Sequence, residues 1–190
     1  MDKLLKLDLC CGPTKPEGFF GIDCIEFPGV DLVHDFNDDH FYVHLNMSRR
    51  PENKGPRRII PLDDNTCEVI RAHDAIEHIA DGYMLMKEIW RVGIDNALVD
   101  ILVPSTDGRG AFQDQTHKSY YNQNSFGYWV NDAAWVDYYR GSCLFKYEEL
   151  YTTSMSSDQV CHVVFKARIV KNAEWLKKYS DRQMSVRQQG

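Results

Sequence analysis

The sequence lacks the long apolar runs of a membrane protein. No stretch approaches the ~20 consecutive apolar residues that a membrane-spanning helix needs. The apolar part of segment 1–9, MDKLLKLDL, is too short and too interrupted for a signal peptide, and no small-residue cleavage site follows it. We therefore expect a cytoplasmic protein without membrane attachment.

An excess of positive charge is also missing. The chain has 22 Lys and Arg residues against 28 Asp and Glu residues, a formal net charge of -6. Such a balance argues against a broad surface that binds nucleic acid through its phosphates, because that binding depends on phosphate neutralisation. We regard nucleic acid as a disfavoured partner.

Two familiar motifs are absent as well. There is no G-x-G-x-x-G fingerprint, which argues against a dinucleotide-dependent oxidoreductase. There is no C-x-x-C pair of the kind that holds a metal ion, so we expect most cysteines to be small core residues in a reducing compartment. The cysteines are Cys10, Cys11, Cys24, Cys67, Cys143 and Cys161.

Length and composition describe one ordinary globular domain. The chain has 190 residues, 43% of them hydrophobic and 26% charged. One hydrophobic core usually serves roughly 100–200 residues. We predict a single domain over residues 1–176 and a polar tail over residues 177–190.

Short apolar runs and turn residues alternate in the rhythm of an α/β fold with a Rossmann-like, doubly wound, mostly parallel sheet. The connection 12–18, GPTKPEG, is too short and too rich in Pro and Gly for a crossover helix. The run 96–105 is nearly continuous in apolar residues, which favours a central strand buried on both faces. We expect a helix over residues 81–93, ended by Gly93, and an antiparallel edge hairpin near the carboxyl terminus. The expected strands are 4–10, 19–25, 30–36, 67–76 (running into the start of a helix), 96–105, 144–153 and 159–170.

Polar and glycine residues follow the expected strands. LDLCCG ends the first strand at Gly12, and Asp23 and Asp35 end the second and third. Parallel sheets bind ligands at the carboxyl ends of their strands, where a glycine permits close approach and a carboxylate accepts the hydroxyl hydrogens of a ribose. These positions indicate a cofactor of the nucleoside type.

The same motifs resemble those of class I S-adenosylmethionine-dependent methyltransferases, in particular a compact subgroup similar to type 11. LDLCCG resembles the glycine motif LDLGCG, with Cys10 in place of the first glycine, and GID resembles the acidic ribose-binding motif. VHDF, IIPLDDNTCEVIRAHDAIEHI and LMKEIWRVGIDNALVDILVP are similar to three further motifs, so the resemblance covers roughly residues 4–126.

The resemblance implies a methyltransferase with S-adenosylmethionine as cofactor and S-adenosylhomocysteine as product. It places Asp8 near the methionine amino group, Asp23 at the ribose and Asp35 near the adenine. For Asp74 and Glu77 the alternative is a helix cap and a first-turn acid. The implied cofactor-binding residues are Asp8, Cys10, Cys11, Gly12, Asp23, Cys24, Asp35, Phe36, His73, Asp74 and Glu77.

The loop AFQDQTHKSYYNQNSF, residues 111–126, supplies candidate catalytic residues. Asp114 and His117 are spaced to form an orienting carboxylate and a general base, or to pin a long loop. His78 is a second base candidate, with backbone hydrogen bonding as its alternative role. A metal site formed by His73, His78 and His117 is disfavoured because no pair has the i, i+4 spacing of a helical zinc motif, and we predict no metal.

The methyl acceptor is the least defined part of the prediction. A small chain without a recognition domain favours a small molecule or a nucleotide or sugar. The basic group Arg49, Arg50, Lys54, Arg57 and Arg58 either binds an anionic acceptor or forms a solvated loop. No N-P-P-Y or D-P-P-Y motif follows the fourth strand, which disfavours methylation of a base amino group. The alternative function is a degenerate member of the fold that binds the cofactor or a partner without turnover.

Overall fold

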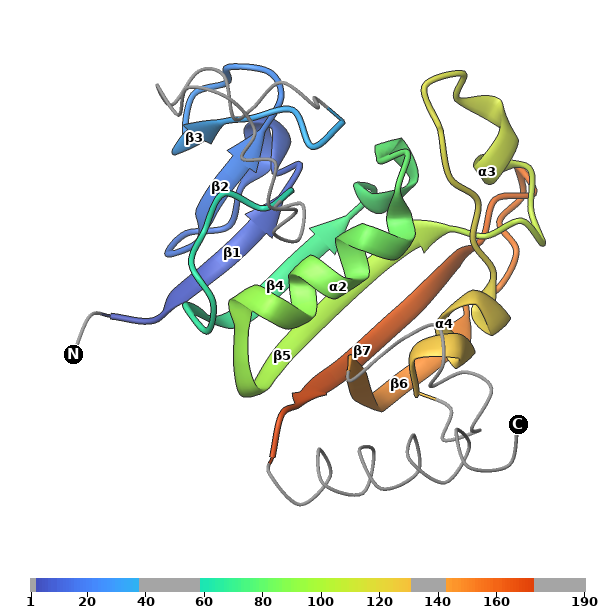
Figure 1. Cartoon of the computed structure of the whole chain (residues 1–190). Helices are drawn as coiled ribbons and strands as arrows, with labels where there is room; N and C mark the ends of the chain where they lie inside the picture. The colour runs from blue at the N-terminus through green and yellow to red at the C-terminus, as the bar shows by residue number, and fades with distance from the viewer. Residues whose placement is uncertain (1–2, 38–58, 131–142, 173–190) are drawn as a thin grey trace, which may run out of the picture.

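A computed structural model describes residues 3–37, 59–130 and 143–172 of the chain. These residues form a seven-stranded sheet in the order β3-β2-β1-β4-β5-β7-β6 (Figure 1). The strands are β1 (Leu5–Leu9), β2 (Phe20–Asp23), β3 (Leu32–Val33), β4 (Cys67–His73), β5 (Gly93–Pro104), β6 (Leu144–Thr152) and β7 (His162–Val170). The helices are α2 (Gly82–Val92), α3 (Gly110–Gln113) and α4 (Gln123–Val130), with 3-10 turns η1 (Gly12–Thr14) and η2 (Ile76–His78).

The predicted mostly parallel sheet is confirmed. Strands β1 to β5 pair in parallel, β7 runs antiparallel to β5, and β6 runs antiparallel to β7 at the edge. The connection from β1 to β2 contains only the short turn η1, as its proline and glycine content indicated. The strand order of the sheet reverses direction between β1 and β4. The carboxyl ends of these two strands therefore flank the position where such sheets bind ligands.

Helix α2 forms where the spacing of apolar residues predicted it. The Asp81 side chain caps its first turn by accepting a hydrogen bond from the Met84 amide at 2.9 Å. Leu85 and Ile89 lie on the face that it buries against the sheet. The expected glycine stop has a different physical basis, because Gly93 is extended (φ -72°, ψ 145°) and starts β5 directly. A Cβ there would lie 2.2 Å from Ile169 Cδ1, so close packing requires the glycine.

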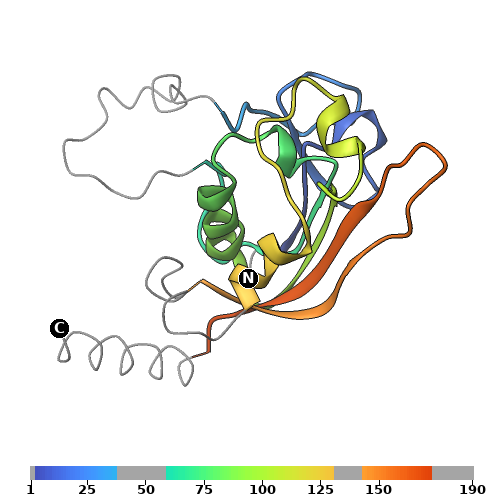
Figure 2. The same ribbon diagram turned by 90° about the vertical axis from the view of Figure 1, so that its right-hand side faces the viewer.

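The two helices α2 and α4 lie on the same side of the sheet (Figure 2). Burial alternates along strand β5 as a consequence, and Val99, Ile101 and Val103 are fully buried on the side that the helices cover. The residues between them, such as Leu98 and Asp100, are only half-buried. The expectation that this strand is buried on both faces is therefore wrong, since the opposite face keeps contact with solvent.

A row of charged side chains of alternating sign crosses that opposite face. Each residue lies directly across from the next in strand register, and side-chain exposure rises along the row from 0% at Asp8 to 44% at Glu149. Opposite charges at facing positions stabilise a sheet modestly and tolerate water. The row is Asp8 (β1), Arg71 (β4), Asp100 (β5), Lys166 (β7) and Glu149 (β6).

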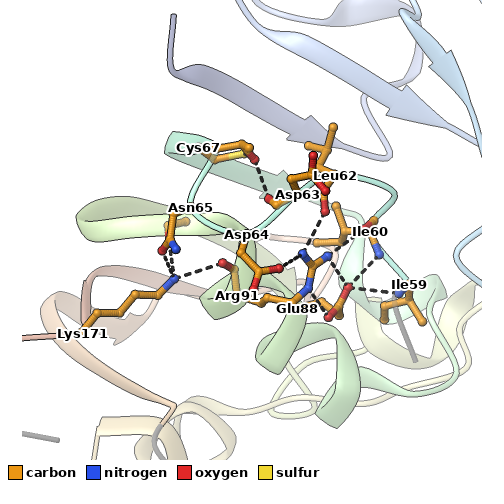
Figure 3. Close-up of polar contacts among 12 residues, drawn as sticks. Ile59, Ile60, Leu62, Asp63, Asp64, Asn65, Cys67, Glu88, Arg91 and Lys171 are labelled. Carbon is orange, nitrogen blue, oxygen red and sulfur yellow. Dashed lines mark hydrogen bonds and ion pairs between the residues drawn. The ribbon is translucent and has the colours of Figure 1, made fainter. Parts of the chain in front are cut away.

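A buried ion pair fastens the segment before β4 to α2 (Figure 3). Glu88 is 3% exposed and lies 2.6 Å from Arg91 Nε through its Oε1 atom. Its other oxygen accepts hydrogen bonds from the backbone amides of Ile59 and Ile60 at 3.1 and 3.2 Å. Arg91 in turn donates to the carbonyl oxygens of Ile60 and Leu62. All charges and donors of this pair are therefore matched by a partner.

Within the described residues, no helix is long and apolar enough to cross a membrane. The basic group of residues 49–58 and the tail 177–190 lie outside the described residues, and the proposals on them stay predictions.

Candidate functional site

The glycine motif forms a tight turn at the carboxyl end of β1. Cys10 and Gly12 have φ angles of 52° and 54°, in the left-handed region that glycine adopts most readily. Nothing lies within 4 Å of the position that a Cβ of Gly12 would take, so the space above this turn is open. The backbone of Cys10 thus retains the conformation for which a glycine is the usual residue.

Asp23 at the end of β2 holds this turn in place. Its Oδ2 atom accepts a hydrogen bond from the Gly12 amide at 2.9 Å, and its Oδ1 atom accepts one from the Ile25 amide at 2.9 Å. The side chain is 6% exposed. Each carboxylate oxygen can accept a second hydrogen bond, so Asp23 can also bind hydroxyl groups of a ligand.

Asp8 has a buried oxygen atom with no partner. Its Oδ1 atom accepts a hydrogen bond from Arg71 Nη1 at 2.7 Å, whereas Oδ2 has no hydrogen-bond partner among the described residues. Burial raises the pKa of Asp8, and the Arg71 guanidinium opposes this rise. An unsatisfied buried acceptor is costly, and such atoms are often satisfied by a ligand.

The two cysteines of the motif are not set up as nucleophiles. Burial raises the pKa of the Cys10 thiol, and the nearby charges of Asp23 and other acidic groups add to the rise. Burial likewise raises the pKa of Cys11 to about 11. A Cβ on Gly21 would lie 2.6 Å from Cys11 Sγ, so this thiol fills the space over β2. Both cysteines therefore serve packing and turn geometry rather than thiolate chemistry.

The residues after β2 and β3 differ in their exposure. Cys24 and Asp35 are exposed, and Asp35 Oδ1 accepts a hydrogen bond from the Asn37 amide at 2.8 Å. Phe36 is 4% exposed and belongs to the hydrophobic core, where its ring packs edge-on against His34. The Phe36 side chain is therefore part of the core, and the role near adenine that the resemblance gave it stays a prediction.

His73 and Asp74 are engaged with neighbouring strands. Arg71 Nη2 lies 3.0 Å from His73 Nδ1, and His73 Nε2 lies 3.2 Å from Asp100 Oδ1. This contact with His73 lowers the pKa of Asp100. The exposed Asp74 has a φ of 47° and lies 3.4 Å from His162 Nε2. Both side chains thus have structural partners at the end of β4.

Glu77 is a buried carboxylate without side-chain partners. It is 2% exposed, and neither Oε1 nor Oε2 has a hydrogen-bond partner among the described residues. Burial raises the pKa of Glu77 to about 7. His117 Nε2 lies 3.9 Å from Glu77 Oε1, beyond hydrogen-bonding distance. The sequence analysis gave Glu77 a second possible role, that of an acid in the first turn of a helix. The Glu77 backbone does lie in the turn η2, but this role does not explain why the carboxylate is buried.

The structure brings His117 and His78 together. Their rings meet edge to face with centroids 4.9 Å apart. His117 Nδ1 lies 2.8 Å from the Ala111 carbonyl oxygen, and His78 Nδ1 lies 3.0 Å from Thr116 Oγ1. The predicted alternative for His78, a ring bond to neighbouring backbone, is replaced by this contact across the site.

The Asp114 and His117 side chains do not pair with each other, and both bond nearby backbone, which matches the predicted alternative that they pin the loop. The Asp114 carboxylate accepts hydrogen bonds from the Thr116 amide and hydroxyl, both at 2.7 Å, in a local turn. Its side chain is therefore used locally, and a backbone carbonyl orients His117 instead. Asp114 acts on His78 through Thr116, which the sequence analysis did not single out.

The segment after β5 is fastened to η2 and its flank. The amides of Lys118 and Ser119 donate to the Glu77 carbonyl oxygen at 2.7 and 2.9 Å, and the Ser119 hydroxyl donates to Ile79 at 2.6 Å. On the other side, Asn37 accepts from the Ala80 amide at 2.8 Å. The histidines and Glu77 are thus carried by segments that hydrogen bonds hold together.

No protein-family model and no curated protein sequence matches this chain. Solved structures match it in fold. A candidate methyltransferase of Bacillus halodurans aligns with a TM-score of 0.55 and 12% identity over 87% of this chain and 92% of its own. The [4+2]-cyclase SpnF aligns with a TM-score of 0.56 and 11% identity over 90% and 77%.

A third match has ligands in its site. It is the 1,6-didemethyltoxoflavin-N1-methyltransferase of Burkholderia thailandensis with bound 1,6-didemethyltoxoflavin and S-adenosylhomocysteine. It aligns with a TM-score of 0.52 and 12% identity over 88% of this chain and 71% of its own. These likenesses and the strand order give this chain the fold of the class I S-adenosylmethionine-dependent methyltransferases.

Proposed function

We propose that the protein is an S-adenosylmethionine-dependent methyltransferase that acts on a small-molecule acceptor. The observation that carries this proposal is the left-handed turn at Cys10 and Gly12, held by Asp23 beside the unsatisfied Oδ2 atom of Asp8. These groups meet at the ligand-binding edge of a sheet with methyltransferase strand order.

The chemistry of these groups fits the cofactor. Asp8 Oδ2 is a buried acceptor that an ammonium group would satisfy, and Asp23 has lone pairs left for ribose hydroxyls. The open space above Gly12 leaves room for a ligand against the backbone. In our proposal Asp8 binds the methionine amino group, Asp23 binds the ribose, and Asp35 lies beside the adenine.

When bound, the cofactor supplies an electrophilic methyl group on sulfur. The chain's own residues then need to align the acceptor and, for a hydroxyl or amine, take up one proton. His117 fits this task in the metal-free protein, because Nδ1 is engaged with the Ala111 carbonyl and Nε2 faces Glu77 at 3.9 Å. His78 is the second candidate, and Asp114 positions it through Thr116.

Two observations favour a second function. Cys10 occupies a turn position for which glycine is the usual residue, and a [4+2]-cyclase has the same fold. A fold alone does not determine the reaction. The competing proposal is a protein that binds S-adenosylmethionine or a partner without methyl transfer.

Within the described residues no cysteine forms a disulfide, and we place the reaction in the reducing environment of the cytoplasm. The acceptor in this proposal is a small molecule, with a nucleotide or sugar as the narrower option. An anionic acceptor would be served by the basic residues 49–58, which lie outside the described residues.

Calorimetric titration tests the cofactor assignment. We expect sub-millimolar binding of S-adenosylmethionine and S-adenosylhomocysteine and none of NAD. Asp23→Ala should weaken S-adenosylhomocysteine binding by about 1.5–3 kcal/mol, the range for hydrogen bonds to a charged group. Equal affinity in this variant, or binding of NAD alone, would contradict the proposal. Turnover of a labelled methyl group in the presence of candidate acceptors separates the two competing functions.

A further inference from the structure

We propose that Glu77, His78 and His117 form a binding site for a divalent transition-metal ion. One potential ligand atom from each residue lies within 4.8 Å of the other two. The histidines come from η2 and from the segment after β5, so only the fold brings them together. This proposal goes beyond the methyltransferase function and does not depend on cofactor binding.

In both imidazole rings the hydrogen bond at Nδ1 leaves Nε2 as the nitrogen available to a metal ion. The Ala111 carbonyl can only accept, so His117 Nδ1 carries the proton of that hydrogen bond. The Thr116 hydroxyl donates its one proton to Asp114 at 2.7 Å, so it accepts from His78 Nδ1 at 3.0 Å. In both neutral rings Nε2 therefore keeps its lone pair. Metal-binding histidines are commonly fixed in this way by an oxygen at the other ring nitrogen.

Glu77 supplies an independent indication of a ligand. Its carboxylate is 98% removed from solvent, because the residue is only 2% exposed, and both oxygens lack hydrogen-bond partners. An isolated buried carboxylate is costly, since burial removes its hydration without a replacement. A metal ion would compensate both oxygens at once. Lys118 and Ser119 hold the Glu77 backbone but do not reach its carboxylate.

The three potential ligand atoms lie within 4.8 Å of one another, and one pair among them is close to the spacing of a bound site. Zinc bonds to nitrogen and oxygen ligands of about 2.0–2.2 Å place neighbouring tetrahedral ligands about 3.4 Å apart. Glu77 Oε1 and His117 Nε2 are 3.9 Å apart, so a contraction of about half an ångström would be enough for this pair. The His117 side chain is only 5% exposed, so the half-buried His78 is the ligand by which an ion would enter from solvent.

The ligand types select the class of ion. Two imidazoles and one carboxylate suit zinc, iron, cobalt or manganese better than calcium or magnesium, which prefer oxygen ligands alone. Three protein ligands leave at least one position open, as in catalytic rather than structural zinc sites. With an ion bound, His117 is a ligand and no longer a base, and an acceptor oxygen could occupy the open position.

Metal titration of the full chain tests this site. The protein is stripped with a chelator, and Zn²⁺ binding is followed by calorimetry and Co²⁺ binding by visible absorption. We expect one Zn²⁺ per chain at the site. Glu77→Gln keeps the side-chain shape and removes the carboxylate charge. It should lower Zn²⁺ affinity by more than the roughly 10–100-fold loss that is typical when a residue hydrogen-bonded to a metal ligand is changed. His117→Ala should do the same, and Thr116→Val should weaken it by about 10-fold.

A matched control and a second ligand make the outcome decisive. His162→Asn removes a histidine paired with Asp74 outside the cluster and should leave Zn²⁺ affinity unchanged. Zn²⁺ binding that is absent in the parent, or equally tight in the parent, Glu77→Gln and His117→Ala, overturns the proposal. S-adenosylhomocysteine is titrated in the same samples with circular dichroism as a folding check. Loss of one ligand with retention of the other shows which proposal has failed.

Discussion

Arg71 Nη1 lies 2.7 Å from Asp8 Oδ1, so one oxygen of a fully buried carboxylate is neutralised while Oδ2 is left for another group. The guanidinium also contacts His73 Nδ1 at 3.0 Å, which fixes its orientation across β4. Asp8 is thus prepared to accept one further hydrogen bond without a change in its surroundings. This arrangement would allow an acid in the interior to bind a cationic ligand group, the role that we propose for Asp8.

Asp8→Asn should therefore weaken S-adenosylhomocysteine binding. Asn keeps an oxygen for Arg71 but replaces the negatively charged acceptor, so a loss of about 1.5–3 kcal/mol is expected from a charge-assisted hydrogen bond. The measurement is a calorimetric titration beside Asp100→Asn, a carboxylate of the same charged row two strands away. A loss of equal size in both variants would point to a general effect on the sheet and would contradict the assignment of Asp8.

Cys10→Gly should be tolerated and should keep or improve cofactor affinity. With a φ of 52°, Cys10 bears the strain that a non-glycine residue meets in the left-handed region. Relief of that strain stabilises the folded protein, whereas the flexibility of glycine stabilises the unfolded chain. Because the two effects oppose each other, we expect the unfolding free energy to change by no more than about 1 kcal/mol. The control is Cys11→Gly at a φ of -67°, where no strain is relieved and a buried thiol is lost. Denaturant unfolding and titration with S-adenosylhomocysteine measure both effects. A Cys10→Gly protein that folds but does not bind would contradict the match to the glycine motif.

The features predicted well from sequence depend on neighbours along the chain. The β1 turn follows from the residues of LDLCCG, and the amphipathic spacing of Leu85 and Ile89 predicted α2. The parallel order followed from the alternation of strands and connections. These signals are local, so one sequence is enough to detect them.

The features that were missed depend on contacts between distant segments. Thr116 and His78 are separated by 38 positions, and nothing in either motif indicates that they meet. The contact of Asp114 with Thr116 is local, but that it connects Asp114 to His78 depends on the distant contact of Thr116. The open face of β5 could not be foreseen either, because one Asp100 in an apolar run is compatible with a buried ion pair.

The Glu88–Arg91 pair should be essential for stability. Removal of Glu88 leaves the largely buried Arg91 guanidinium with the exposed Asp64 carboxylate, 2.7 Å away, as its remaining charged partner. The cost should therefore approach the roughly 3–5 kcal/mol of a fully uncompensated buried charge. Glu88→Gln should therefore lower the unfolding free energy by an amount in this range, and the backbone amides of Ile59 and Ile60 lose a charged acceptor as well. Denaturant unfolding measures the change.

The matched control for this pair is Glu148→Gln at the sheet edge. Glu148 accepts from Arg168 Nε at 2.8 Å, but both side chains are well exposed, at 48% and 35%. Exposed pairs contribute about 0–1 kcal/mol because water and salt screen them. Equal losses in Glu88→Gln and Glu148→Gln would show that burial does not set the strength of these pairs.

Asp100 should make stability depend on pH in the acid range. The contact with His73 holds the pKa of Asp100 below the ordinary value of 3.8. The folded protein therefore binds a proton at this site less readily than the unfolded chain does. The resulting stabilisation is fully present above pH 3.8 and is lost as the pH falls through the lower pKa of the folded state.

The variant Asp100→Asn isolates this contribution. The difference in unfolding free energy between the parent and Asp100→Asn should be constant from about pH 6 to pH 5 and should shrink toward about pH 2.5. Lys166→Met removes the neighbouring cation of the same row. It should change the lowered pKa of Asp100 only slightly, because the His73 contact is the largest cause of that lowering. Urea unfolding at a series of pH values measures the difference. A difference that stays constant through this range would mean that Asp100 has the same pKa in the folded and unfolded chains, and the His73 contact would then contribute nothing to stability.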